Sequence, residues 1–234
     1  MSVIGGPDII TDGLVLHLDA ADKKSYPGSG TTWYDRSGNG NHGTLVNSPT
    51  FDGGNGGSVS FDGTDDHVLG NIPSSTFTSP HSISCWLYRE TVKQWSGLFS
   101  NNVNTASCSI FTFINSTNSL GTNQAGVNPT AIAIDLGADH LNKWIYAVIT
   151  FSGVSNGSSV NVYAYKDGSL LTANGSLYWS MSSSSSYYIG RHWDYQNRYE
   201  VHDGFISQIS VYNKVLSASE VSRNYNATKG RFNL

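Results

Sequence analysis

Short runs of alternating apolar and polar residues recur along this chain, and Gly, Asn, Asp and Ser separate them. Such alternation over four to eight residues predicts β-strands with one buried face. The runs cover 13–20, 58–63, 66–70, 82–90, 108–115, 130–135, 143–153, 159–171, 186–190 and 204–213. Many strands without alternating helices predict an all-β sandwich of two antiparallel sheets.

Two local signals refine this pattern. The Asp-Gly pair at 167–168 supplies the positive φ angles of a tight turn and predicts a β-hairpin. Near the C-terminus, Ser217 and Glu220 have the spacing of a capping box, which marks the start of a helix. Val221 and Tyr225 lie four residues apart on that helix, so we expect one short helix that docks on a sheet.

The composition fits one folded domain. The chain has 234 residues, of which 12% are aromatic, enough to build a core, and only 13% are charged. We expect residues 12–234 to form one domain. Residues 1–11 carry three isoleucines and a Gly-Gly-Pro break, which predicts an N-terminal arm that docks on a partner or mediates trimerisation. The alternative is a short strand that folds onto the same domain.

Charge and hydropathy exclude several classes of function. The net charge is −4 and the 13 Lys and Arg residues are scattered, so we expect no nucleic-acid partner. No apolar run is long enough for a membrane span, and we expect no membrane insertion and no signal peptide. Cys85 and Cys108 lie in strand-like runs, where buried thiols are expected, or a disulfide if the two strands are neighbours.

Several segments together resemble a known family. They are "GLVLHLDAADKKSYPGSGTTWYDRSGNGNHGTL", "SVSFDGTDDHV", "SISCWLY", "KWIYAVITFSG" with "VNVYAYKDGSLL", and "GFISQISVYNKVLSASEV". In this order, from residue 13 to about 228, they resemble the laminin-G-like, concanavalin A-like lectin/glucanase jelly roll. The resemblance implies two curved antiparallel sheets of six or seven strands. The opening "LDAADKKSYPGSGTTWYDRSGNGN" and the ending "VSRNYNATKGRF" are similar to versions in bacteriophage structural proteins, notably of marine tailed phages.

What such domains do varies, so the resemblance implies a function only in outline. Members bind glycans, decorate surfaces or serve as accessory modules. We therefore expect a non-enzymatic virion surface protein: a capsid decoration, fibre or tail-associated adhesion component. It would be made in the host cytoplasm and end in the virion. The expected partners are other virion proteins, host surface glycans and further copies of this chain. The alternative is a free carbohydrate-binding module, and a third, less favoured class is a glycoside hydrolase.

Catalytic chemistry finds little support in the residues. Retaining glycosidases need two carboxylates about 5 Å apart, and the glucanase relatives carry them as Glu-x-Asp-x-Glu. This chain has only Glu90, Glu200 and Glu220 and lacks that motif. It also lacks the Gly-x-Ser-x-Gly nucleophile elbow and the His-Glu-x-x-His zinc motif. We expect no enzyme and no catalytic residues.

One loop has the spacing of a calcium site. Oxygen-bearing side chains recur at every second position, at Asp35, Ser37, Asn39 and Asn41, with Gly40 to turn the chain. Hard Ca²⁺ binds six to eight oxygens, so this set is the candidate metal site. The closing Glu of such loops is replaced here by Val46. The alternative is that Asp35 and Asn39 make Asx-turns that brace the loop.

Two further stretches bear on metal binding. The segment 62–66 offers a second acidic cluster of Asp62, Asp65 and Asp66. The resemblance implies a calcium carboxylate in the last strand, but Ser207 and Gln208 occupy those positions. The seven histidines show no His-x-His or His-x₃-His pair, and we expect His17 to be a partly buried strand residue.

The segment 190–204 is unusually aromatic for a connection between strands. The candidate ligand-binding residues are Arg191, His192, Trp193, Tyr195, Asn197, Arg198 and Tyr199. Rings beside amide and guanidinium groups match the apolar faces and hydroxyls of sugars, and Tyr and Trp give rigid contact area. The alternatives are a subunit contact or packing within the chain.

The loop that starts at Thr31 opens with Trp33 and Tyr34. We expect both rings to pack beneath the loop and hold it to the sandwich, while its glycines let the backbone turn. A folded connection is thus the main interpretation, a calcium cradle the second and sugar stacking on Trp33 the third.

Overall fold

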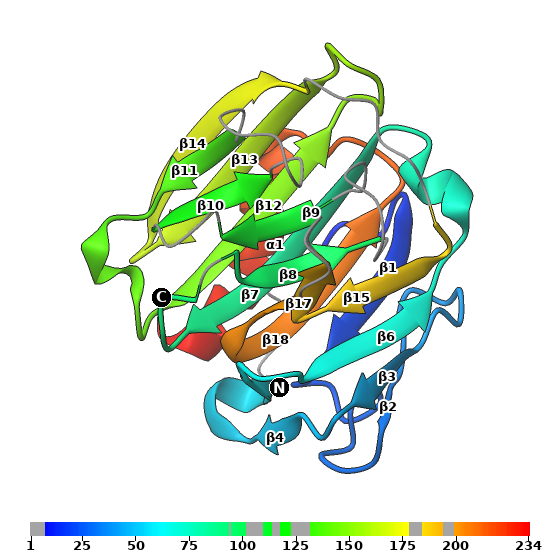
Figure 1. Ribbon diagram of the computed structural model, residues 1–234, viewed down its shortest axis with the longest axis vertical. Helices are drawn as coiled ribbons and strands as arrows, with labels where there is room; N and C mark the ends of the chain where they lie inside the picture. The colour runs from blue at the N-terminus through cyan, green and yellow to red at the C-terminus, as the bar shows by residue number, and fades with distance from the viewer. Residues whose placement is uncertain are drawn as a thin grey trace, which may run out of the picture.

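The protein is a sandwich of two stacked antiparallel sheets (Figure 1). A computed structural model describes residues 8–93, 95–101, 110–113, 118–122, 132–177, 184–193 and 199–234. Each sheet has eight strands, one or two more than the six or seven expected. The all-β sandwich with one short C-terminal helix is confirmed.

Sheet A has the strand order β14-β13-β12-β7-β18-β5-β4, and β1 pairs with β18 off this path. Its strands are β1 (Leu14–Asp19), β4 (Thr50–Asp52), β5 (Ser58–Asp62), β7 (His81–Arg89), β12 (Trp144–Phe151), β13 (Ser159–Lys166), β14 (Ser169–Ser176) and β18 (Asp203–Tyr212). The strands come from both halves of the sequence, so the sheet closes only when distant segments meet.

Sheet B has the order β11-β10-β9-β8-β15-β6-β3-β2. Its strands are β2 (Thr32–Trp33), β3 (Gly43–Val46), β6 (His67–Asn71), β8 (Gly97–Ser100), β9 (Ile110–Phe113), β10 (Ser119–Thr122), β11 (Ile132–Asp135) and β15 (Ser186–Ile189). A separate two-stranded hairpin joins β16 (Arg191–Trp193) to β17 (Tyr199–Val201). The described residues also form four short 3₁₀ turns: η1 (Gly54–Gly56), η2 (Ser74–Phe77), η3 (Ala138–His140) and η4 (Lys229–Phe232).

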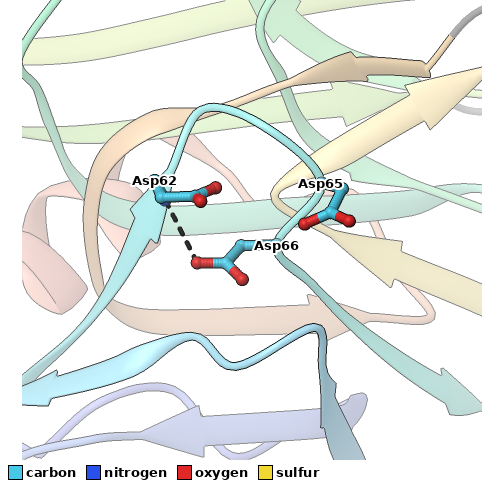
Figure 2. A group of neighbouring side chains, drawn as sticks. All are labelled: Asp62, Asp65 and Asp66. Carbon is cyan, nitrogen blue, oxygen red and sulfur yellow. Dashed lines mark hydrogen bonds between the residues drawn. The ribbon is translucent and has the colours of Figure 1, made fainter.

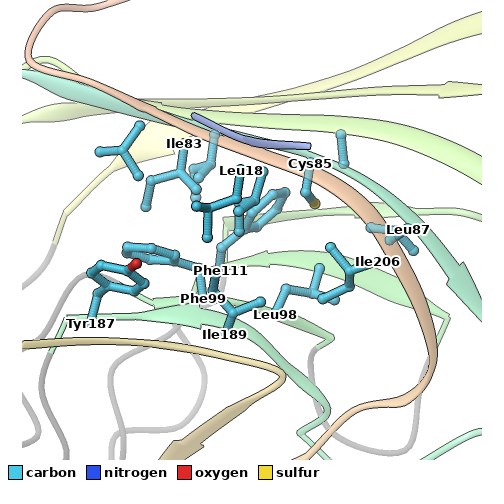
Figure 3. Close-up of a cluster of buried hydrophobic side chains, with 14 of the residues drawn as sticks. Leu18, Ile83, Cys85, Leu87, Leu98, Phe99, Phe111, Tyr187, Ile189 and Ile206 are labelled. Atoms are coloured by element: carbon cyan, nitrogen blue, oxygen red, sulfur yellow. The ribbon is translucent and has the colours of Figure 1, made fainter. Parts of the chain in front are cut away.

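The central strand β7 shows how sequence alternation builds two separate cores. Ile83, Cys85 and Leu87 point into the sandwich and belong to the main core between the sheets. They face sheet B residues such as Phe99 and Phe111 (Figure 3). Trp86 points the other way and belongs to a second cluster on the outer face of sheet A. Burying both faces explains why this strand is almost entirely apolar or small.

The C-terminal helix α1 (Ala218–Thr228) covers part of that outer face (Figure 1). Its capping box is confirmed, because Ser217 Oγ accepts from the Glu220 amide and Glu220 accepts from the Ser217 amide. Val221 and Tyr225 are buried in the outer cluster, and Tyr225 stacks on Tyr165 with ring centroids 3.9 Å apart. Burial of these apolar side chains against sheet A therefore stabilises the helix.

The predicted hairpin at 167–168 is also confirmed. Asp167 has φ 50° and Gly168 has φ 77°, so both central residues have the positive φ of a type I′ turn. This turn fixes the register of β13 on β14, in which Lys166 lies opposite Ser169.

Several smaller expectations have mixed outcomes. Cys85 is a buried free thiol, and burial raises its pKa. Cys108 lies outside the described residues.

Within the part of the chain that the structure describes, no helix has the length and hydropathy needed to cross a membrane. Residues 8–11 contact the helix, since the Ile10 amide donates to Asn224, while residues 1–7 of the predicted arm lie outside the described part.

Candidate functional site

The loop 35–43 is organised around the carboxylate of Asp35. This buried side chain accepts four hydrogen bonds. The donors are the amides of His17, Ser37 and Asn41 at 2.8–2.9 Å and the hydroxyl of Ser37 at 2.7 Å. A carboxylate that accepts backbone amides two and six residues ahead fixes the path of the loop in the manner of an Asx-turn.

The other candidate metal ligands point toward β1. Asn39 Nδ2 and Asn41 Nδ2 donate to the carbonyl oxygen of Val15 at 3.2 and 2.8 Å. Ser37 Oγ, whose one proton is donated to Asp35, also lies 2.9 Å from that oxygen. In this arrangement the side-chain amides of Asn39 and Asn41 donate, the Asp35 carboxylate and the Val15 carbonyl accept, and the Ser37 hydroxyl donates to Asp35 while it accepts from Asn39. The structure thus brings the four candidate ligands together and shows a complete internal bracing network among them. A calcium ion at this position remains a prediction.

The two aromatics before the loop have different positions. Trp33 is fully buried in the main core, as expected. Tyr34 differs from the expectation, because it is 43% exposed and contacts the His42 ring edge-on at 5.3 Å. Successive residues of a strand point to opposite faces, so only one ring of the pair can pack beneath the loop.

The second acidic cluster lies on the tight turn between β5 and β6 (Figure 2). The ligand atoms of Asp62, Asp65 and Asp66 lie within 4.8 Å of one another. Asp66 is buried; one carboxylate oxygen accepts from the Asp62 amide at 3.2 Å, while Oδ1 has no hydrogen-bond donor. Burial first, and then the charges of Asp62 and Asp65, raise the pKa of Asp66.

Asp62 has the opposite perturbation. Hydrogen bonds from backbone amides, that of Thr64 foremost, lower the pKa of its carboxyl group. Among the residues that the structure describes, these three carboxylates are the only group of His, Cys, Asp and Glu with metal-binding spacing. They meet the oxygen preference of Ca²⁺, and the sequence had marked them as the second choice after Asp35.

The predicted ligand segment forms the hairpin β16–β17, which contacts β8. Arg191 is half-buried, and its guanidinium carbon lies 4.8 Å from the centre of the Tyr188 ring, a cation–π contact. His192 is buried beside it. Trp193 and Tyr199 pair across the hairpin through their backbones. Tyr195, Asn197 and Arg198 lie outside the described residues.

Two residues beside Arg191, Tyr188 and His67, were not among the ligand-binding residues predicted from the sequence. The Tyr188 ring lies 6.2 Å from that of His67, whose Nδ1 is 2.9 Å from the Asp65 carbonyl oxygen. Burial is the largest of the effects that lower the pKa of His67. Arg191, Tyr188 and His67 therefore link the hairpin to the acidic turn, and we call these three residues the hairpin cluster. Strand pairing of β15 with β6 produces it, and no short motif encodes that pairing.

A hollow with a volume of about 470 Å³ lies between β1, β18 and the C-terminal helix. Its lining is mainly polar and includes His17, Asp19, Gln208 and Arg231. Arg231 binds Asp19 through two bonds of 2.7 Å, and His17 Nδ1 lies 2.8 Å from Ser210 Oγ. Ser207, at one of the two positions where the resemblance implied a calcium carboxylate, is buried and donates to the Gly57 carbonyl.

The placement of the carboxylates bears on catalysis. Glu220 is occupied by its capping box and by Lys214 at 2.8 Å, and Glu90 is exposed. The closely spaced aspartates share one tight turn, whereas glycosidase carboxylates flank a bound sugar from two sides. Among the described residues, Glu90, Glu220 and these aspartates therefore do not form such a flanking pair.

Comparison with known proteins agrees with the fold. A model of the Laminin_G_3 family, the concanavalin A-like lectin/glucanases superfamily, matches residues 61–222. Because this match covers more than half of the sequence, the chain belongs to that family. No curated protein sequence matches it.

Solved structures share the fold at low sequence identity. A mutant of Trypanosoma rangeli sialidase that displays trans-sialidase activity is 15% identical, with a TM-score of 0.65, over 97% of this chain and 35% of its own. The receptor-binding domain of botulinum neurotoxin C/D mosaic serotype is 14% identical, with a TM-score of 0.65, over 94% of this chain and 52% of its own. This chain therefore spans a third to a half of these structures, and the likeness concerns the fold alone.

Proposed function

We propose that this protein is a non-catalytic adhesion protein that contacts glycans through the hairpin β16–β17 and the hairpin cluster. The carrying observation is Arg191 held over Tyr188 next to His67, at the base of a hairpin rich in aromatic residues. A guanidinium group fixed on a ring offers both a hydrogen-bond fork and apolar contact area. Membership of a lectin/glucanase superfamily supports a carbohydrate ligand.

The setting that we propose is the surface of a bacteriophage virion. The chain would be a capsid decoration, a fibre or a tail-associated component, with neighbouring virion subunits, further copies of itself and host glycans as partners. The support is the resemblance of the segments 18–41 and 221–232 to bacteriophage structural proteins. Calcium bound at Asp35 or at the 62–66 turn would serve to stiffen these loops.

A glycan array with the purified chain tests this function. We expect selective binding, and we expect Arg191→Ala and Trp193→Ala to weaken it while Asp12→Ala, at an exposed position far along the sequence, leaves it unchanged. If the chain binds no sugar, and Arg191→Ala and Trp193→Ala lose association with phage particles, the partner of the hairpin is a virion subunit and not a glycan. Release of reducing sugar from any polysaccharide, abolished by Glu200→Gln, would refute the non-catalytic assignment.

The alternative is a free carbohydrate-binding module. Selective binding by an isolated monomer that never co-purifies with capsid or tail proteins favours this alternative. Co-purification with particle proteins favours the virion component.

A further inference from the structure

Three aromatic side chains lie in a row on the outer face of sheet A, away from the hairpin cluster. Trp144, Tyr88 and Phe205 come from the adjacent strands β12, β7 and β18, where Tyr88 is the register partner of both others. The ring centroids are 5.5 Å apart for Tyr88 and Trp144 and 5.6 Å apart for Tyr88 and Phe205. All three side chains are half-buried. We call them the aromatic row.

Core packing does not account for the aromatic row. Tyr88 and Phe205 belong to neither the main core nor the outer cluster under α1. Trp144 only borders the outer cluster, through Phe232 at 4.6 Å between ring centroids. The opposite faces of the same strands already supply the sandwich core with residues such as Leu87 and Ile206. The aromatic row therefore adds exposed apolar area that the fold does not require.

Polar groups complete a small hollow above the rings. Its volume is about 160 Å³, and Asp52, Asn55 and Ser58 line it together with the aromatic row. Asn55 is exposed at the rim with φ 51° inside the turn η1. Gly57 ends this turn with φ 134°, and a Cβ there would lie 2.6 Å from the Ala20 carbonyl oxygen. A backbone that only glycine permits thus holds the Asn55 amide beside the rings.

The chemistry of this hollow selects an uncharged ligand with hydroxyl groups. Aromatic rings contact the apolar face of a sugar ring, while amide, carboxylate and hydroxyl groups bind its hydroxyls. None of the six residues that line the hollow carries a positive charge. Cations on neighbouring segments are committed elsewhere, Arg231 to Asp19 and Lys143 to Asp167 at 2.7 Å. A phosphate-bearing strand would therefore meet Asp52 without a compensating cation.

We infer that the aromatic row and its polar rim form a second glycan-binding site, which takes a short segment of a neutral oligosaccharide. The inference rests on the proposed glycan-contacting function and extends it to the opposite side of the sandwich. Neighbouring strands lie about 4.8 Å apart, so the row extends about 10 Å. That length exceeds one sugar ring and suits a linear chain laid across the three strands.

The test uses the full chain labelled with ¹⁵N at its tryptophan indoles. The Trp144 signal is assigned from the Trp144→Phe variant, and the chain is titrated with cellohexaose, laminarihexaose and mannohexaose. We expect at least one of these hexasaccharides to shift the Trp144 indole signal. In calorimetry, Tyr88→Thr and Phe205→Thr each lower the affinity about tenfold, about 1.4 kcal/mol. Asn55→Gly keeps the positive φ and lowers the affinity less.

Control variants separate this site from the hairpin. Leu170→Thr changes an exposed apolar residue on β14 of the same sheet and keeps the affinity. Arg191→Ala also keeps the hexasaccharide affinity at the aromatic row. If a hexasaccharide binds but leaves Trp144 unshifted, and Arg191→Ala abolishes binding, the second site is refuted while the proposed function stands. If decaproline or a dT oligonucleotide shifts Trp144 and no sugar does, the glycan assignment is refuted. Because the indole readout uses the unmutated chain, misfolding of a variant cannot obscure the answer.

Discussion

Removal of the Asp35 carboxylate by Asp35→Ala is the sharpest test of how the loop 35–43 is held. The change deletes the acceptor of three backbone amides and one hydroxyl. The His17 amide is buried, so leaving it without an acceptor costs about 1–3 kcal/mol. The amides of Ser37 and Asn41 are partly buried and can recover water, which limits their cost to about 0.5–1 kcal/mol each.

Together these losses amount to about 2–5 kcal/mol, a large share of the stability of an ordinary domain. Urea unfolding followed by tryptophan fluorescence measures the change. Asp35→Asn retains one acceptor oxygen, and we expect an intermediate loss. Asp12→Ala is the matched control, because its side chain is 83% exposed and has only a surface ion pair with Lys214.

A loss below about 1 kcal/mol in Asp35→Ala would refute this reasoning, since it would mean that the amides find other partners without cost. The same samples test calcium. If added calcium stabilises the unmutated chain and Asp35→Asn alone abolishes that gain, the ion binds at this loop and the carboxylate is a metal ligand as well as a brace.

Three further predictions concern single groups. In the presence of a chelator, Asp66→Asn raises the free energy of unfolding in urea by about 1 kcal/mol, because it removes a buried charge whose Oδ1 has no hydrogen-bond donor. If calcium binds the 62–66 turn, the same variant loses the stabilisation that calcium gives the unmutated chain. An unchanged stability both with chelator and with calcium would contradict the expectation. Burial lowers the pKa values of His81 and His202 to about 4, below the 6.5 of the unfolded chain. The unfolded state therefore binds more protons between these values, so stability is complete above about pH 6.5 and falls as the pH drops toward 4; His202→Gln should flatten that fall in urea titrations at stepped pH, and an unaltered slope would count against it. Ser217→Ala removes the helix N-cap and should cost about 1 kcal/mol in thermal or urea unfolding, whereas Ser219→Ala on the same turn should cost less than half of that.

Local patterns predicted most of the fold. The capping box at Ser217 and the Asp-Gly turn at 167–168 each depend on residues within four positions, so the sequence alone specifies them. The alternation in β7 indicated a strand, but it could not reveal that both of its faces are covered. Burial of the second face depends on where α1 packs, which is a tertiary contact that the local pattern does not specify.

The candidate sites were harder to predict for the same reason. Asp35, Ser37, Asn39 and Asn41 do converge, yet their roles follow from β1 lying alongside them, 18 to 26 residues earlier in the chain. The hairpin cluster and the aromatic row combine residues that are more than 100 positions apart, such as Tyr88 and Phe205. The spacing of residues within one segment cannot predict contacts with distant segments, because strand pairing determines which residues become neighbours.

The bracing of the loop 35–43 has a consequence for how copies of this chain behave in concentrated solution. Strand β1 pairs with β18 on one side only, which leaves its other side as a template that a strand of another molecule could extend. On that other side, the Val15 carbonyl accepts from the Asn41 side chain and the His17 amide donates to Asp35. The His17 carbonyl accepts from the Arg36 amide, and the Asp19 amide donates to Ser25. The loop 35–43 and its neighbours thus form the hydrogen bonds that an adjacent strand would otherwise make with β1. This arrangement opposes edge-to-edge pairing of β1 between copies of the chain.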